Sequence, residues 1–268
     1  MIKIIHNAGF FSCCSVKLSK IVEFINLNKK LPDKVDSSKQ FHWYKNDNCK
    51  EQDITFDYFE HYENVPDINI IHPINYNWRH QFKNYANLDY KCITPLIKKY
   101  FSPSSEINEI IISIEKKYNL LYENICVLFH RGNDKNREQK KCSYDEYLNY
   151  ANKLLVSFFL KKKSKIVFLI QSDETEFIEF MKKKFPNNSF YFKDEIRHMK
   201  KCNSTVDIKM SSQNYEFSKK YLAITIIMSR CNYIICGSGN CDKWIMFYRG
   251  NNKHVIQNLS GTWYNMAF

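Results

Sequence analysis

The stretch Cys126–Lys135, CVLFHRGNDK, joins a short apolar run to groups that can do chemistry. The run stops at His130 and Arg131, and Gly132 opens a turn. In open α/β sheets, ligands bind beyond the carboxyl ends of the strands, so these side chains are candidates for a site. Arg131 carries a fixed charge and a planar fork of donors that suits a diphosphate. A surface salt bridge is the alternative role for such an arginine.

Two later loops also follow apolar runs and carry small or charged residues. Ser172 and Asp173 follow the run Ile166–Gln171, and Gly237–Cys241 follows Tyr233–Cys236. Backbone N–H groups of a glycine-containing loop at a helix start can bind a phosphate, although such a loop can also be a plain connector. Asp173 can accept from a ribose hydroxyl or a base, or it can cap the next helix. Because parallel strands end at one sheet edge, we expect the three loops to lie together.

Strands and helices alternate along the chain, with the periodicities that distinguish them. We predict strands at 2–6, 67–72, 125–130, 166–171, 190–192, 233–236 and 255–257. We predict helices at 16–29, 76–101 with an interruption at Thr94-Pro95, 107–118, 143–159, 173–184, 216–230 and 241–248. Such alternation is typical of βαβ units around a parallel sheet. We therefore expect an α/β protein with two domains, residues 1–120 and 121–268.

The chain begins with a predicted strand, a loop of small residues and a helix. The loop, NAGFFSCCS at 7–15, contains Gly9 and Phe10. A helix that starts beside small residues presents unpaired backbone N–H groups to a ligand. An ordinary strand-to-helix turn is the alternative.

Composition restricts the class of protein. The 268 residues are 44% hydrophobic and 16% aromatic, enough for an ordered core, and the net charge is +12. The basic clusters are runs of two or three lysines, so the sequence favours a lysine-rich surface or an anionic small ligand over nucleic acid. The ten cysteines form no CxxC and have no histidine at zinc spacing, which predicts buried free thiols and no metal.

Targeting signals are not evident in the sequence. The start MIKIIHNAGFF lacks the long apolar core of a signal peptide, and no apolar run approaches 18 residues. We expect a soluble, cytoplasmic protein without a membrane span.

Several segments together resemble one enzyme family. HRGNDK at 130–135 resembles the H-x-R-x-x-D-type signature of fucosyltransferases with the GT-B fold, the α-1,6-, O- and α-1,2-fucosyltransferase superfamily. Three later segments resemble the elements that follow it, namely SYDEYLNYANKLL, IVFLIQSDETEFIEFMKKKFPN and CNYIICGSGNCDKWIMFYRG. NAGFFSCCSVKLSKIVEFI resembles the family's glycine-rich first loop and helix. The chain departs from the family at Gly132, where a second arginine or a small polar residue is common, and in having His130 directly before Arg131.

The resemblance implies two Rossmann-like domains that face each other across a cleft. It implies inverting transfer from a nucleotide sugar, typically GDP-fucose, to a glycan or protein acceptor, without metal or cofactor. In the family's pattern Arg131 binds the donor β-phosphate, Asp173 beside Ser172 contacts the guanosine, and the loop at 238–240 holds the pyrophosphate. The candidate donor-binding residues are His130, Arg131, Ser172, Asp173, Ser238, Gly239, Asn240, Cys241, Gly9 and Phe10.

A base for the acceptor hydroxyl is also needed. The resemblance points to Glu138, the carboxylate a few residues beyond Arg131, although a solvated loop charge is the plain alternative. Asp134 is the second candidate, or it braces Arg131. An acceptor sugar can stack on Trp43 or Trp78, whereas burial in the core is the alternative for both indoles.

Two other classes of function compete with the transferase. A basic, non-catalytic protein that binds a nucleotide, a glycan or nucleic acid would share the composition. A dinucleotide-dependent oxidoreductase would share the α/β pattern, but the first strand is not followed by GxGxxG.

Overall fold

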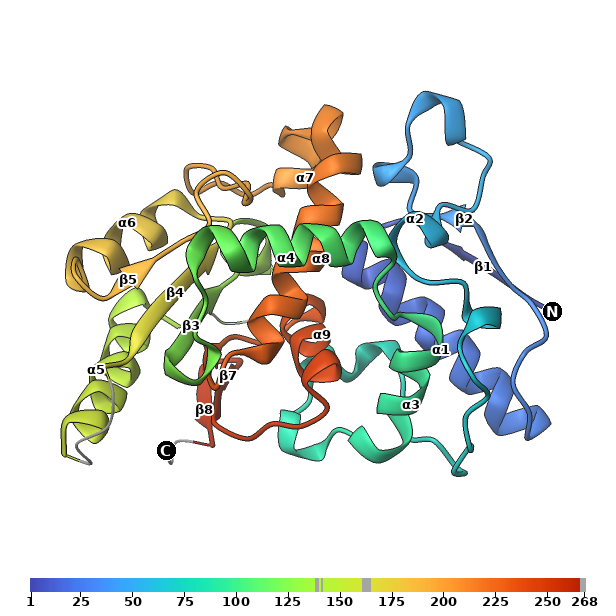
Figure 1. The fold of residues 1–268 in the computed structure, drawn as a ribbon, viewed down its shortest axis with the longest axis horizontal. Helices are drawn as coiled ribbons and strands as arrows, with labels where there is room; N and C mark the ends of the chain where they lie inside the picture. Colours follow the sequence, from blue (N-terminus) through green and yellow to red (C-terminus); the bar gives the residue numbers. More distant parts are fainter. Residues whose placement is uncertain (138–139, 141, 161–164, 266–268) are drawn as a thin grey trace.

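Two sheets of unequal size organise the computed structural model, which describes residues 1–137, 140, 142–160 and 165–265 (Figure 1). The strands are β1 (Ile2–His6), β2 (Val35–Gln40), β3 (Ile125–His130), β4 (Val167–Ser172), β5 (Ser189–Phe190), β6 (Tyr233–Cys236), β7 (Val255–Leu259) and β8 (Thr262–Tyr264). β1 and β2 form a parallel pair, and the larger sheet has the order β5-β4-β3-β6-β7-β8. Among the described strands of this sheet, β8 alone is antiparallel to its neighbour.

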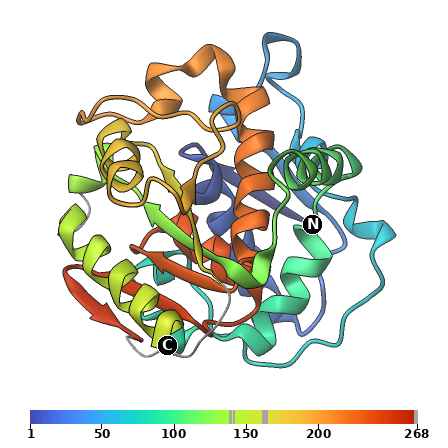
Figure 2. The same cartoon turned by 60° about the vertical axis from the view of Figure 1, so that its left-hand side comes forward.

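Helices connect and cover these strands. The α-helices are α1 (Phe10–Asn28), α2 (Thr55–Tyr58), α3 (Tyr90–Tyr100), α4 (Ser105–Tyr118), α5 (Tyr144–Leu160), α6 (Thr175–Lys184), α7 (Val206–Lys209), α8 (Asn214–Arg230) and α9 (Asn240–Arg249). Short 3₁₀ turns include η1 (His42–Tyr44), η4 (Trp78–Phe82) and η7 (Asn133–Arg137). α5 and α6 lie on one side of the larger sheet, and α8 lies on the other, where it packs against α4 and α9 (Figure 2).

β3 is a central strand of the larger sheet. All six of its residues are buried, as expected for a parallel strand covered on both faces. It pairs with β4 on one side and β6 on the other, so that His130 lies opposite Ser172 and Phe129 opposite Cys236. The loops after β3, β4 and β6 therefore share one edge, as predicted, at the point where strand order reverses.

Helices of the N-terminal part pack against helices of the second half. α1 packs on β1 and β2 and also contacts α9 and η4. An aromatic cluster around Phe10 anchors its first turn, with Phe41 and Tyr58 among the contacting rings. α4, from the first 120 residues, packs along α8 of the second half. The division into domains 1–120 and 121–268 stays a prediction.

Several expected elements differ in the structure. Residues 67–72 form no strand. The strand that pairs with β1 is β2, a polar segment with only Val35, Ser37 and Gln40 buried. α1 begins at Phe10 instead of Val16, because Gly9 caps it and the residues that resemble a turn are buried in its first turns. α3 is shorter than predicted and contains Pro95 without interruption. These errors share a cause, since burial set by tertiary contacts outweighed the local pattern.

Candidate active site

A cleft of about 340 Å³ lies between the two halves of the chain. The first half contributes Gly9, Phe10, Ser12, Trp43 and Trp78 to its lining. The second half contributes Arg131, Asp134, Lys135, Gly239, Asn240, Cys241 and Asp242. The volume falls within the range of small-molecule sites, roughly 300–1,000 Å³. The cleft thus joins the first loop of the chain to two of the three loops predicted to converge.

Arg131 is held rigidly on one wall of this cleft. Its Nε donates to Asp173 Oδ2 at 3.1 Å, and its Nη1 donates to the Tyr221 hydroxyl at 3.2 Å and to Cys241 Sγ at 2.9 Å. Nη2 lies 3.6 Å from Asp134 Oδ1. Burial disfavours the charged guanidinium, but these neighbours raise the pKa of Arg131 well above its ordinary value. The result is a permanent, oriented cation with 17% of its side chain exposed.

Asp173 is the brace that orients this cation. Its Oδ1 accepts from the Gly132 N–H at 2.8 Å while Oδ2 accepts from Arg131. Its backbone carbonyl also accepts from the Asn133 side chain at 2.8 Å. The carboxylate is therefore bonded within the protein, and a contact between Asp173 and a guanosine stays a prediction.

Glu174 and His130 form a second buried pair behind the arginine. Glu174 accepts from the Asn133 N–H at 2.7 Å and from the Tyr144 hydroxyl at 2.6 Å, and its Oε2 lies 3.1 Å from His130 Nε2. Burial opposes the charge on Glu174, but these hydrogen bonds hold its pKa well below the ordinary value. The His130 ring stacks on Phe177 with centroids 4.7 Å apart. His130 thus fixes the loop, and Glu174 is a site-forming residue that was not predicted from the sequence.

The loop between β6 and α9 forms part of the same wall. Gly239 caps α9, and a Cβ at this position would lie 3.0 Å from Asp242 Oδ2, so the backbone and the carboxylate are in close contact. Burial raises the pKa of Asp242 to about 6, against the opposing effect of Arg131. Asn240 accepts from Ser15 of α1 at 2.8 Å, which ties the two sides of the cleft together. The first N–H groups of a helix have no intrahelical partner and can face an anion here.

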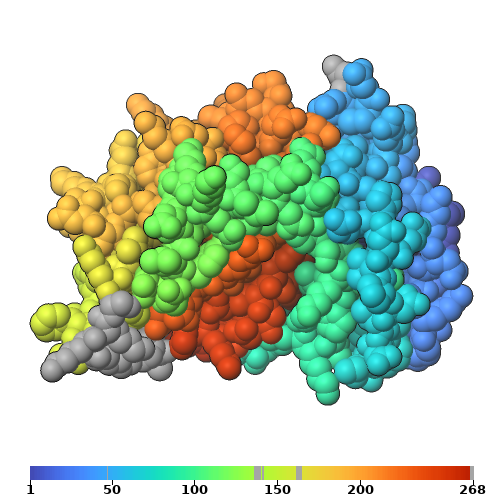
Figure 3. All heavy atoms as spheres, viewed as in Figure 1, coloured from blue at the N-terminus to red at the C-terminus, as the bar shows by residue number. Residues whose placement is uncertain are grey.

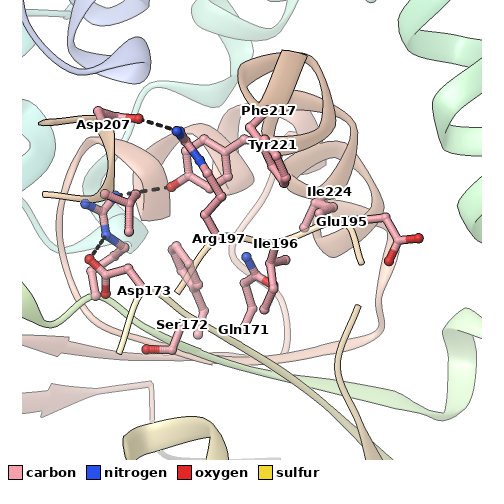
Figure 4. Close-up of a pocket in the computed structure, with 13 residues that line it drawn as sticks. Gln171, Ser172, Asp173, Glu195, Ile196, Arg197, Asp207, Phe217, Tyr221 and Ile224 are labelled. Carbon is pink, nitrogen blue, oxygen red and sulfur yellow. Dashed lines mark hydrogen bonds and ion pairs between the residues drawn. The ribbon is translucent and has the colours of Figure 1, made fainter. Parts of the chain in front are cut away.

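A smaller cavity of about 40 Å³ adjoins Arg131 (Figure 4). Figure 4 shows Gln171 and Ser172 at one end and Arg197 at the other, where it meets Asp207. The Gln171 Oε1 atom is buried and has no hydrogen-bond partner among the described residues. A buried acceptor without a partner is costly, so this atom is available to an N–H donor. At this volume the cavity admits groups of the size of a few waters.

Asp207 lines both the cleft and the smaller cavity. Its Oδ1 accepts from Arg197 at 2.7 Å, and its Oδ2 accepts from the Tyr44 hydroxyl at 3.0 Å. Tyr44 in turn accepts from the Phe10 N–H at 2.7 Å. The space-filling view shows the orange segment around α7 beside the blue segment around η1 (Figure 3). A hydrogen-bonded bridge therefore spans the two halves beside the site.

The structure brings most of the predicted site residues together. Gly9, Phe10, Arg131, Asp134, Gly239, Asn240 and Cys241 line the cleft. His130, Ser172 and Ser238 are buried and do not line it: Ser172 accepts from the Glu174 N–H at 3.0 Å, and Ser238 donates to the Asn258 carbonyl at 2.8 Å. Their roles in donor binding stay predictions.

The predictions for the base Glu138 and for the two tryptophans have different outcomes. Glu138 lies outside the described residues. Trp43 and Trp78 both line the cleft instead of lying in the core. Ser12, at the end of the N-terminal loop Gly9–Ser12 that we expected to face the site, lines it as well. Tyr221 and Asp242 line it too and were not predicted, and only their position next to predicted site segments could have drawn attention to them.

The thiols, metal ligands and helices add three observations. None of the ten cysteines is in a disulfide. Within the described ranges, no three His, Cys, Asp or Glu side chains gather as they would around a metal ion. In the same ranges, no helix combines the length and apolar character needed to cross a bilayer.

Comparisons with known proteins found neighbours only among solved structures. No family model and no curated protein matches the chain. NodZ α-1,6-fucosyltransferase soaked with GDP-fucose is 14% identical over 63% of this chain and 51% of its own, with a TM-score of 0.40. Fucosyltransferase NodZ from Bradyrhizobium is 14% identical over 63% of this chain and 49% of its own, with a TM-score of 0.40.

A plant protein is a further neighbour. A mutant of Arabidopsis thaliana FUT1 in complex with GDP is 10% identical over 63% of this chain and 36% of its own, with a TM-score of 0.40. The chain thus spans about half or less of the length of these proteins.

Proposed function

We propose that the protein is a glycosyltransferase that moves fucose from GDP-fucose to a hydroxyl of a glycan or protein acceptor, with inversion and without a metal. The observation that carries this proposal is Arg131, fixed by Asp173 and facing a cleft that the α9 loop also lines. One wall of the cleft thus carries a permanent cation and the N–H groups at the start of α9. The first half of the chain forms the opposite wall.

The arrangement suits a diphosphate leaving group. When the bond between the sugar C1 and the phosphate oxygen breaks, negative charge grows on the diphosphate. Arg131 and the N–H groups at the start of α9 can stabilise that charge without reorganising. Lys135 lines the same cleft, and its Nζ lies 3.7 Å from Asp134 Oδ2. Asp134 is therefore held between two cations and does not oppose an incoming phosphate strongly.

The opposite wall is the natural place for the acceptor. Trp43 and Trp78 line the cleft from the first half, and 38% of Trp78 is exposed. Sugar rings present apolar C–H faces that pack on indoles. An acceptor hydroxyl that attacks C1 from this side, opposite the departing diphosphate, inverts the anomeric centre.

The nucleoside has a separate place next to Arg131. The smaller cavity beside it offers apolar walls, including Phe217 and Ile224, and the Gln171 oxygen, which has no partner among the residues that the structure describes. A nucleobase is too large for the 40 Å³ cavity and would enter it only after the ion pair between Arg197 and Asp207 separates. The guanine in our proposal therefore rests on the family resemblance, whereas the diphosphate rests on the described geometry.

Two measurements test the proposal. In a thermal-shift panel of GDP, UDP, TDP and CMP sugars, a donor at 100 times its Kd stabilises the protein by about 2.7 kcal/mol. We expect a shift with GDP-fucose, and a shift with another nucleotide alone would correct the donor. Absence of any shift, with salt-sensitive binding to a nucleic acid, would favour the non-catalytic alternative.

The second measurement is transfer by arginine variants. Arg131→Ala should lower kcat by about 10²–10³, the usual effect of losing one charge-stabilising donor. Arg230→Ala is the matched control, because Arg230 is an exposed arginine of α8 that pairs with Glu115. A folded Arg131→Ala protein with full transfer would refute the site.

A further inference from the structure

His6 and Ser12 form a hydrogen-bonded pair at the edge of the cleft. His6 is the last residue of β1, and Ser12 lies in the first turn of α1. The Nε2 atom of His6 is 3.0 Å from the Ser12 hydroxyl oxygen. Ser12 lines the 340 Å³ cleft, on the wall opposite Arg131. A neutral imidazole with its proton on Nδ1 accepts from this hydroxyl through Nε2.

The carboxylates of the cleft are less suited to act as the base. Asp207 is already bonded to Arg197 and to the Tyr44 hydroxyl. Asp134 lies between Arg131 and Lys135, so its charge is already neutralised on the wall that faces the diphosphate. Asp242 is enclosed, with 2% exposure, and contacts the loop of Gly239 on the same wall. A base for the acceptor hydroxyl belongs on the opposite wall, which Ser12 lines with His6 behind it.

We propose that Ser12 and His6 are a proton relay that activates the acceptor hydroxyl, with Ser12 in contact with the acceptor and His6 positioned behind it. This inference rests on the proposed function and names the group that completes its chemistry. The acceptor oxygen bonds to the sugar C1 as the bond from C1 to the phosphate oxygen breaks, and that electron pair leaves with the diphosphate. The acceptor proton passes to Ser12 Oγ while the Ser12 proton passes to His6 Nε2. The imidazolium then releases its proton to water.

The surroundings of His6 favour its neutral form. Burial lowers the pKa of His6 from its ordinary value of 6.5, and no charged side chain of the described residues contributes to that shift. From β2 its register partner is Gln40, an amide. From α1 it faces Ser12 and lies next to Cys13, whose thiol is kept neutral because burial raises its pKa. The imidazole can therefore accept a proton at neutral pH.

The hydrogen bond between His6 and Ser12 also links the end of β1 to the start of α1. The test therefore has to distinguish a proton relay from a purely structural link. A relay requires neutral His6, so kcat should fall as the pH is lowered below 6.5, whereas a tie between two elements predicts no such dependence. The chain offers a matched control in His198, whose Nδ1 lies 2.8 Å from the Thr175 hydroxyl. Burial lowers the pKa of His198 as well, and neither residue lines the cleft.

The experiment measures kcat, donor KM and donor thermal shift from pH 5 to 8 for the wild type and for His6→Gln, Ser12→Ala and His198→Gln. We expect His6→Gln to lower kcat by about 10²–10³, within the usual range for loss of a general base. It should also abolish the acidic limb of the pH–rate profile, which is the fall in kcat below pH 6.5. Ser12→Ala should behave similarly, while donor KM and thermal shift stay unchanged and His198→Gln matches the wild type.

Three results would overturn the inference. One is a His6→Gln protein that keeps the acidic limb, even with a reduced rate. Another is loss of that limb in Asp242→Asn alone, which would transfer the role to Asp242. The third, decisive even if His6→Gln does not fold, is a normal rate and pH profile for Ser12→Ala. A wild type that binds no nucleotide sugar and transfers none would instead refute the proposed function, and this inference with it.

Discussion

Gly132 must be glycine because Glu174 fills the space where a side chain would begin. A Cβ at position 132 would lie 1.7 Å from Glu174 Cδ and 1.9 Å from its Oε1. Glu174 is fully buried and bonded to Asn133 and Tyr144, so it cannot swing aside without losing these partners. Gly132→Ala therefore has to displace either the carboxylate or the loop that carries Arg131.

The size of the effect follows from the bonds that would break. Each buried group left without its hydrogen-bond partner costs roughly 1–3 kcal/mol, so the loss of several together costs about 3–5 kcal/mol. Glu174→Ala breaks the bonds with His130, Tyr144 and Asn133 and should cost about that amount. Gly132→Ala displaces the same carboxylate and should cost as much or more. In the double variant the clash is gone, so its total cost should stay close to that of Glu174→Ala alone. The double variant should therefore be about 3 kcal/mol or more stable than the sum of the single effects implies.

The assay is urea unfolding of the four proteins, followed by circular dichroism. Gly9→Ala is the control, because a Cβ there meets only the Tyr44 hydroxyl, at 3.9 Å, and should change stability by less than about 1 kcal/mol. If Gly132→Ala fails to fold, recovery of folding on adding Glu174→Ala reports the same coupling. A Gly132→Ala protein as stable as the wild type, or additive losses in the double variant, would refute this packing.

Two further predictions concern pH. Burial lowers the pKa of Lys243 to about 7 from its ordinary 10.5. Between these two pH values the unfolded chain binds more protons than the folded protein does. The free energy of unfolding therefore rises with pH there, by about 1.4 kcal/mol per pH unit from this residue. Lys243→Met should flatten the rise measured by urea unfolding from pH 7.5 to 9.5, while the exposed Lys20→Met should keep it; equal slopes would contradict the burial. Because the pKa of Glu174 is held well below 4.5, its stabilisation is present above pH 4.5 and is lost as the pH falls towards its folded value. Glu174→Gln should be less stable at pH 7 and lose less between pH 5 and 3, and a loss parallel to the wild type would argue against the depressed pKa.

Local pattern alone was enough for the central strands and the longer helices of the second half, although α7 and β8 were not predicted. The strand Ile125–His130 was predicted at its observed bounds, because a run buried on both faces needs no partner to be recognised. At the start of α5 Ser143 and Glu146 form a capping box, with the Ser143 N–H donating to the Glu146 side chain and the Glu146 N–H donating to the Ser143 hydroxyl. Convergence of the three loops also followed from the sequence, since parallel strands place their carboxyl ends at one edge.

What each side chain does at that edge was decided by the tertiary structure. His130 and Arg131 are adjacent in sequence, yet one turns inward to Glu174 and the other lies on the cleft wall. The pairing of polar β2 with β1 and the contact of His6 with Ser12 depend on segments that the chain brings together only on folding. The sequence by itself thus determined where a site would form, because strand ends are local features. Which groups face the cleft depended on packing between distant segments, which no local pattern records.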